Sequence, residues 1–174
     1  MRSHISWLAL ILGAACQPNT SRPVFSPLPD AAGTEVRLTP AEATRQLAAA
    51  LRADSIPVRK VMVRDAYLET GWFDAKTGRA RSSSLGTGVV LVRAWADPAR
   101  PGSSQLAVET VYRPLADPSL PPRELDRQVP QKHSVAVKVD SVLQQLVKRF
   151  GGPPPPQAEA PAQGTSQERP PDLQ

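Results

Sequence analysis

The strongest constraint on this chain is where its regularly spaced apolar residues occur. They are confined to residues 35–152, because proline-rich stretches without apolar periodicity occupy both flanks. The chain has 20 prolines among its 174 residues, well above the usual share of about 5%. The segment between the flanks is long enough for one hydrophobic core of ordinary size and too short for two. We therefore expect a single folded domain.

Two segments of this region have the spacing of amphipathic helices. Residues 39–42 place a threonine at the N-cap, a proline at the first helical position and a glutamate at the third, which favours a helix start. That helix is predicted to run to about Ala53. The second predicted helix has apolar residues at i, i+3, i+4 and i+7, namely Val135, Val139, Val142, Leu143, Leu146, Val147 and Phe150. Its end is indicated by Gly151 and Gly152.

Four runs between these helices have the alternation of β-strands, at residues 58–63, 67–73, 88–96 and 105–112. In the second run, Leu68, Thr70 and Trp72 fall on one face, which leaves Glu69 on the opposite, solvated face. Strands in hairpin order pair antiparallel. The prediction is an α+β fold of order α-β-β-β-β-α. It consists of a four-stranded antiparallel sheet with the N-terminal and the C-terminal helix packed on one face.

The first sixteen residues have the order of a secretory signal. A short basic start precedes an apolar run from Ile5 to Leu12, and small residues then lead to Cys16, the only cysteine of the chain. The apolar run is too short to span a bilayer, which needs about 20 apolar residues. Two interpretations follow: an ordinary signal that is cleaved nearby, or a signal for lipid attachment at Cys16.

Residues 12–16 favour the second interpretation, because they resemble the cleavage motif of bacterial lipoproteins. The resemblance implies that Cys16 receives a diacylglyceryl thioether, becomes the new N-terminus and is then acylated with a fatty acid such as palmitate. Gly13 departs from the motif, which prefers leucine at that position; the leucine stands one residue earlier, at Leu12. Gln17 replaces the aspartate that typically retains such proteins in the inner membrane. The resemblance therefore implies an outer-membrane protein facing the periplasm.

The complete predicted organisation has four parts. Residues 1–15 are a signal segment and residues 16–34 a disordered tether. Residues 35–152 form the single α+β domain, and residues 153–174 form a disordered, proline-rich tail. Neither the tether nor the tail contains enough large apolar residues to offset the entropy lost on ordering.

The sequence offers little that could carry catalysis. His133 is the only histidine outside the signal segment, and no cysteine pair or metal-binding motif accompanies it. Residues 82–84 are serines, but they lack the sequence context of a nucleophile elbow. We predict a protein that is not an enzyme and that uses no metal or other cofactor. Its net charge is +5, but the basic residues are dispersed and no nucleic-acid-binding motif is present, so we predict no nucleic-acid partner.

The run from Tyr67 to Phe73, after a helix, a tether and a lipoprotein signal, resembles the helix-grip domains of the BamC/NlpB lipoproteins, which are accessory components of outer-membrane β-barrel assembly. The similarity covers residues 40–150 in outline. The resemblance implies an accessory or scaffold role with other envelope proteins as partners, in addition to the bilayer that holds Cys16. An exposed strand edge or helix face would make the contact.

A second functional interpretation starts from the polar loop between two of the predicted strands. Lys76, Arg79 and Arg81 bring three positive charges within six residues. Such a group could bind a polyanionic envelope ligand, such as lipopolysaccharide headgroups or a cell-wall polymer. The sequence leaves both interpretations open, together with the oligomeric state.

Overall fold

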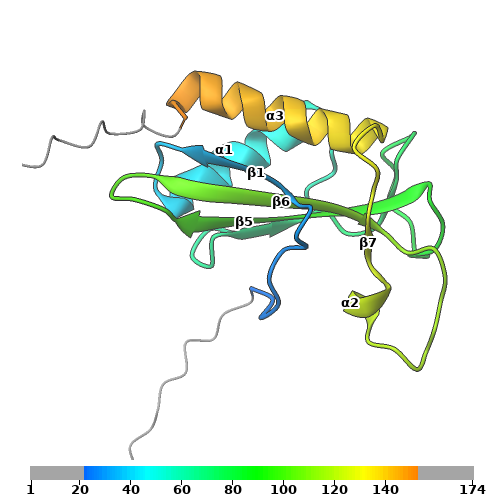
Figure 1. Ribbon diagram of the computed structural model, residues 1–174. Coiled ribbons are helices and arrows are strands. Elements are labelled where there is room, and N and C mark those ends of the chain that lie inside the picture. The colour runs from blue at the N-terminus through cyan, green and yellow to red at the C-terminus, as the bar shows by residue number, and fades with distance from the viewer. Residues whose placement is uncertain (1–21, 153–174) are drawn as a thin grey trace, which may run out of the picture.

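The computed structural model describes residues 22–152, and both predicted helices form within it (Figure 1). Helix α1 spans Pro40–Ala53, and the Thr39 hydroxyl accepts a hydrogen bond from the Glu42 N–H at 3.4 Å. Helix α3 spans Ser134–Phe150. Its N-cap is His133, whose Nδ1 accepts from the Val135 N–H at 3.3 Å. Burial lowers the pKa of His133, which favours the neutral ring that this bond requires.

The sheet has seven strands, and not the four that the alternation predicts. In chain order they are β1 (Ala32–Val36), β2 (Lys60–Met62), β3 (Tyr67–Glu69), β4 (Phe73–Asp74), β5 (Val89–Pro98), β6 (Ser104–Tyr112) and β7 (Arg127–Gln128). The short helix α2 (Pro122–Leu125) precedes β7. The main order is β1-β6-β5-β3-β2, while β4 pairs with β5 and β7 pairs with β6. Every pairing between these strands is antiparallel. The predicted α+β class and antiparallel sheet are confirmed, whereas the predicted strand number is wrong.

The extra strands have physical reasons that the sequence pattern does not reveal. Strand β1 reads Ala-Gly-Thr-Glu-Val and pairs with β6 from Ala32 opposite Val108 to Val36 opposite Ser104. It begins inside residues 16–34, so the predicted boundary of the tether is wrong there. The predicted strand 67–73 is split into β3 and β4 around Gly71, whose φ of +72° interrupts extended backbone. Strand β7 has only two residues.

One hydrophobic core lies between the sheet and the two long helices, which cover the same face of the sheet (Figure 1). Alternate residues of β5 enter it, namely Val90, Val92, Ala94 and Ala96. From α3, Val139, Leu143 and Leu146 are at most 5% exposed. Trp72, which the alternation places on this face, is only partly buried. Its ring instead lies 4.8 Å from the Arg113 guanidinium.

Candidate functional site

The sheet face turned away from α1 and α3 carries a row of charged residues. The strand register places Glu69 of β3 opposite Arg93 of β5, and Arg93 opposite Glu109 of β6. The Arg93 Nη1 donates to Glu109 Oε1 at 2.8 Å and to Asp126 Oδ2 at 2.9 Å. The side chains of Glu109 and Asp126 are fully buried. Two carboxylates are therefore removed from water on this face.

Two further arginines complete what we call the charge network, which comprises Glu69, Arg93, Glu109, Arg113, Arg123 and Asp126. Arg113 Nε donates to Asp126 Oδ1 at 2.7 Å, and Arg123 donates to both Glu109 oxygens at 2.6 and 2.9 Å. Burial alone would lower the pKa of Arg93, but its bonds with Glu109 and Asp126 outweigh burial and raise that pKa. Three cations face three anions, so the network is charge-compensated. Such mutual pairing indicates a structural role.

The predicted solvation of Glu69 is wrong, because this face of the sheet is covered. The Tyr67 hydroxyl donates to Glu69 Oε2 at 2.6 Å, and the Glu69 side chain is 31% exposed. Burial, followed by this bond, raises the pKa of the Tyr67 hydroxyl. Tyr67 also packs edge-on against Trp95, with ring centroids 5.4 Å apart.

The cover is the segment 22–31, which lies beneath the sheet in Figure 1 and leads into β1. The Phe25 ring packs edge-on against Trp95 at 6.2 Å, with the Arg123 guanidinium 4.3 Å from its centroid. The Leu28 N–H donates to Glu109 Oε2 at 3.1 Å, and Arg123 Nη2 donates to the Ser26 carbonyl at 2.8 Å. The charge network therefore binds the segment that precedes β1.

The two edges of the sheet differ in how well they are protected. Strand β2 has three residues and is flanked by Arg59 and Arg64; short length and positive charge are common protections of an edge. Strand β1 has five residues with one charge, Glu35, and no strand pairs with its outer side among residues 22–152. An unpaired edge directs alternate backbone N–H and C=O groups outward. Strand β1 is thus the more open edge.

A groove runs between this edge and α3. It has a volume of about 520 Å³ and is lined on one side by residues 32–34 of β1. The α3 side is formed by Asp140, Leu143, Gln144, Val147 and Lys148. We call it the β1–α3 groove. Leu143 and Val147 give its wall an apolar character, while Lys148 gives it a positive charge.

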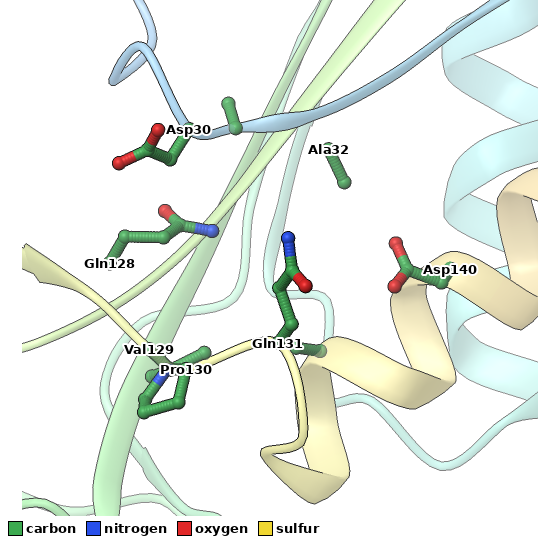
Figure 2. A pocket seen from close by; sticks show the side chains of 9 residues that line it. Asp30, Ala32, Gln128, Val129, Pro130, Gln131 and Asp140 are labelled. Carbon is green, nitrogen blue, oxygen red and sulfur yellow. The ribbon is translucent and has the colours of Figure 1, made fainter.

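A hollow of about 690 Å³ adjoins the groove near the N-terminal ends of β1 and α3 (Figure 2). Ala32 and Asp140 line both spaces, so the two are adjacent. Figure 2 shows the side chains of Asp30, Gln128 and Gln131 around this hollow, with Asp140 on its α3 side. The Gln128 Oε1 is buried and has no hydrogen-bond partner. This end of the groove is therefore rich in hydrogen-bond acceptors.

The structure brings the predicted basic residues Lys76, Arg79 and Arg81 to one loop between β4 and β5, where all three are exposed. The Asp74 carboxylate organises this loop by accepting from the Thr77 and Lys76 N–H groups at 2.9 and 3.1 Å. Bonds from Thr77, followed by the one from Lys76, outweigh burial and lower the pKa of Asp74. A carboxylate thus lies among the three cations.

Two other sequence predictions concern lipidation and metal binding. Cys16, the predicted lipidation site, lies outside the described residues, as do the signal segment and the tail 153–174. Over residues 22–152, no group of three or more histidine, cysteine, aspartate or glutamate side chains is placed to hold a metal ion. In the same range, no helix combines the length and the apolar character needed to cross a membrane.

The sequence was compared with protein-family profiles and with curated proteins. No protein-family profile matches it, and no curated protein is significantly similar to it in sequence.

Proposed function

We propose that this protein is a membrane-anchored lipoprotein of the bacterial envelope with a non-catalytic accessory or scaffold role, in which the domain binds an extended segment of another envelope protein. The β1–α3 groove is the proposed binding site. The observation that carries the proposal is the open edge of β1 beside a helix-lined groove. A partner acting in outer-membrane assembly would fit the resemblance noted above.

Strand addition supplies the binding chemistry. A partner segment laid along β1 would pair with the outward N–H and C=O groups of that strand, which gives affinity without sequence selectivity. Alternate side chains of the segment would then face α3, where Leu143 and Val147 offer apolar contact. The five residues of β1 span about 17 Å at roughly 3.4 Å per residue. The groove therefore suits an extended segment of about that length.

Charge at the two ends of the groove supplies selectivity. Asp30 and Asp140 lie at the end toward the hollow, and Lys148 lies on the other side of the apolar wall. A partner segment would match these charges if it placed a hydrogen-bond donor or a cation near Asp30 and Asp140 and an acidic residue near Lys148. Mismatched charges would be disfavoured, because like charges in contact are costly.

Photo-crosslinking in intact cells tests the site with a matched pair of positions. Gln144 and Gln145 are both exposed on α3. Gln144 lines the groove, whereas Gln145 lies outside its lining and bonds to Ser141. A photoreactive amino acid at position 144 should give a discrete crosslinked protein, and the same amino acid at position 145 should not. Equal crosslinking at both positions, or none at 144, would contradict the proposed site.

The anchor is tested separately at Cys16. Replacing it with serine should leave the protein unprocessed or soluble, because acyl chains contribute about 0.8 kcal/mol per buried methylene to membrane binding. Partitioning between a detergent phase and an aqueous phase measures this, with the wild-type protein as reference. A serine variant that is cleaved and still partitions into detergent would show that Cys16 carries no lipid.

The alternative function is binding of a polyanionic envelope ligand by Lys76, Arg79 and Arg81. The exposure of all three side chains on one loop favours it. Such binding would weaken strongly with ionic strength, because exposed charges are screened by salt. Strand addition at β1 depends on backbone hydrogen bonds and apolar contact, so it should persist at high salt.

A further inference from the structure

We infer that the loop 114–121 and Val24 contact the lipid bilayer that holds Cys16, so that the face of the sheet bearing the charge network is turned toward the membrane and α3 is turned away. This inference rests on the lipid anchor of the proposed function. It adds a second interaction surface, distinct from the β1–α3 groove, and its partner is a lipid surface.

Exposed apolar side chains mark this surface. Val24 is 101% exposed, Leu115 is 53% exposed and Leu120 is 41% exposed. Figure 1 shows that the segment 22–31, the loop before α2 and α2 itself all project from the side of the sheet opposite α3. Single exposed apolar residues are ordinary, but these three occur on two chain segments that project on one side.

A hydrogen bond joins the two segments. Arg123 Nη2 donates to the Ser26 carbonyl at 2.8 Å. Ser26 follows Val24 by two residues, and Arg123 follows Leu120 by three. The guanidinium of Arg123 also lies 4.3 Å from the Phe25 ring. The segment that carries Val24 is therefore joined to α2, directly after the loop, by contacts that also cover the charge network.

The length of chain between the anchor and the domain limits the orientation. Arg22 follows Cys16 by six positions, so the two Cα atoms are at most about 22 Å apart at roughly 3.6 Å per residue. Arg22 is attached to the domain through Asp97, with the ion-pair atoms 2.7 Å apart. If α3 faced the bilayer, the helix layer and the sheet would lie between Arg22 and the membrane. Arg22 would then be about 20 Å from the membrane. That orientation would require an almost fully extended chain between Cys16 and Arg22, whereas the inferred orientation would not.

The loop is suited to a shallow contact. Leu115 and Leu120 flank Asp117 in the sequence. The Asp117 carboxylate accepts from the Ser119 hydroxyl at 2.6 Å and from its N–H at 2.9 Å. These bonds lower the pKa of Asp117, so the group stays charged at neutral pH. A charged carboxylate between two leucines is compatible with the interface between headgroups and acyl chains and incompatible with the hydrocarbon interior.

The experiment compares two positions of equal exposure on opposite sides of the domain. Leu115 in the loop and Val137 in α3 are each 53% exposed. Cys16 is the only cysteine of the chain, and in the anchored protein its sulfur is taken up in the diacylglyceryl thioether. Leu115→Cys and Val137→Cys therefore each supply one free thiol for an environment-sensitive fluorophore. The lipidated mature variants, which begin at Cys16, are reconstituted in vesicles of phosphatidylethanolamine and phosphatidylglycerol that contain a nitroxide-labelled lipid.

The expected result is blue-shifted emission with strong nitroxide quenching at position 115, and neither change at position 137. Equal emission and quenching at the two positions, with both variants bound to the vesicles, would overturn the inference and leave the anchor intact. Failure of both variants to bind vesicles would overturn the anchor and the inference together. A shift at position 115 that occurs in native envelopes but not in protein-free vesicles would assign the loop to a protein partner, and would also overturn it.

Discussion

Replacing Arg93 with methionine should lower the free energy of unfolding by about 3–5 kcal/mol, the range seen when one partner of a buried ion pair is removed. The Arg93 guanidinium donates to both Glu109 and Asp126, whose side chains are fully buried. Without it, two carboxylates would share the remaining arginines in a site closed to water. A domain has only about 5–15 kcal/mol of stability, so the loss is large. Chemical denaturation of the mature chain measures it.

A surface ion pair provides the control. Arg45 and Glu42 lie 2.9 Å apart, close to the 2.8 Å between Arg93 and Glu109, but their side chains are 58% and 38% exposed. Replacing Arg45 with methionine should therefore change the free energy of unfolding by no more than about 1 kcal/mol. Similar losses in the two variants would mean that water reaches the charge network.

Truncating Leu146 to alanine should cost about 2–5 kcal/mol, through lost burial and the cavity left behind. Leu146 is 4% exposed and belongs to the core between α3 and the sheet. Its neighbour Gln145 is exposed, so Gln145→Ala should change the free energy of unfolding by less than about 0.5 kcal/mol. Thermal or chemical unfolding of both variants measures the difference. Equal losses at the two positions would contradict the packing of α3 on the sheet.

The helices were predictable because their signals are local. The N-cap of α1 at Thr39 and the spacing of apolar residues along α3 depend on residues a few positions apart. Strands β5 and β6 were also predicted, because they are long enough to show apolar runs or alternation. Strand β1 has no such pattern, since two of its five residues are Ala32 and Gly33. Its conformation comes from pairing with β6, about seventy residues away.

The charge network was missed for a related reason. Arg93 interrupts a run of apolar residues that occupies both faces of β5. This interruption was the one sequence feature that indicated a buried charged side chain on the sheet. Glu69 and Glu109 alternate with apolar residues, a pattern that ordinarily indicates a solvated face. Phe25 and Leu28 cover that face from a polar, proline-containing segment that offers no strand or helix signal. The β1–α3 groove could not be predicted either, because β1 forms one of its walls and the sequence pattern does not predict that strand.

Amide hydrogen exchange tests the central claim, that β1 is the edge to which a partner adds, most directly. The mature chain is compared alone and with the partner segment that crosslinks at position 144. The predicted result is slowed exchange concentrated in Ala32–Val36, at the residues whose N–H groups point outward, with the loop of Lys76, Arg79 and Arg81 unchanged. Slowed exchange in that loop with no change in β1 would contradict the claim and favour the polyanion-binding alternative.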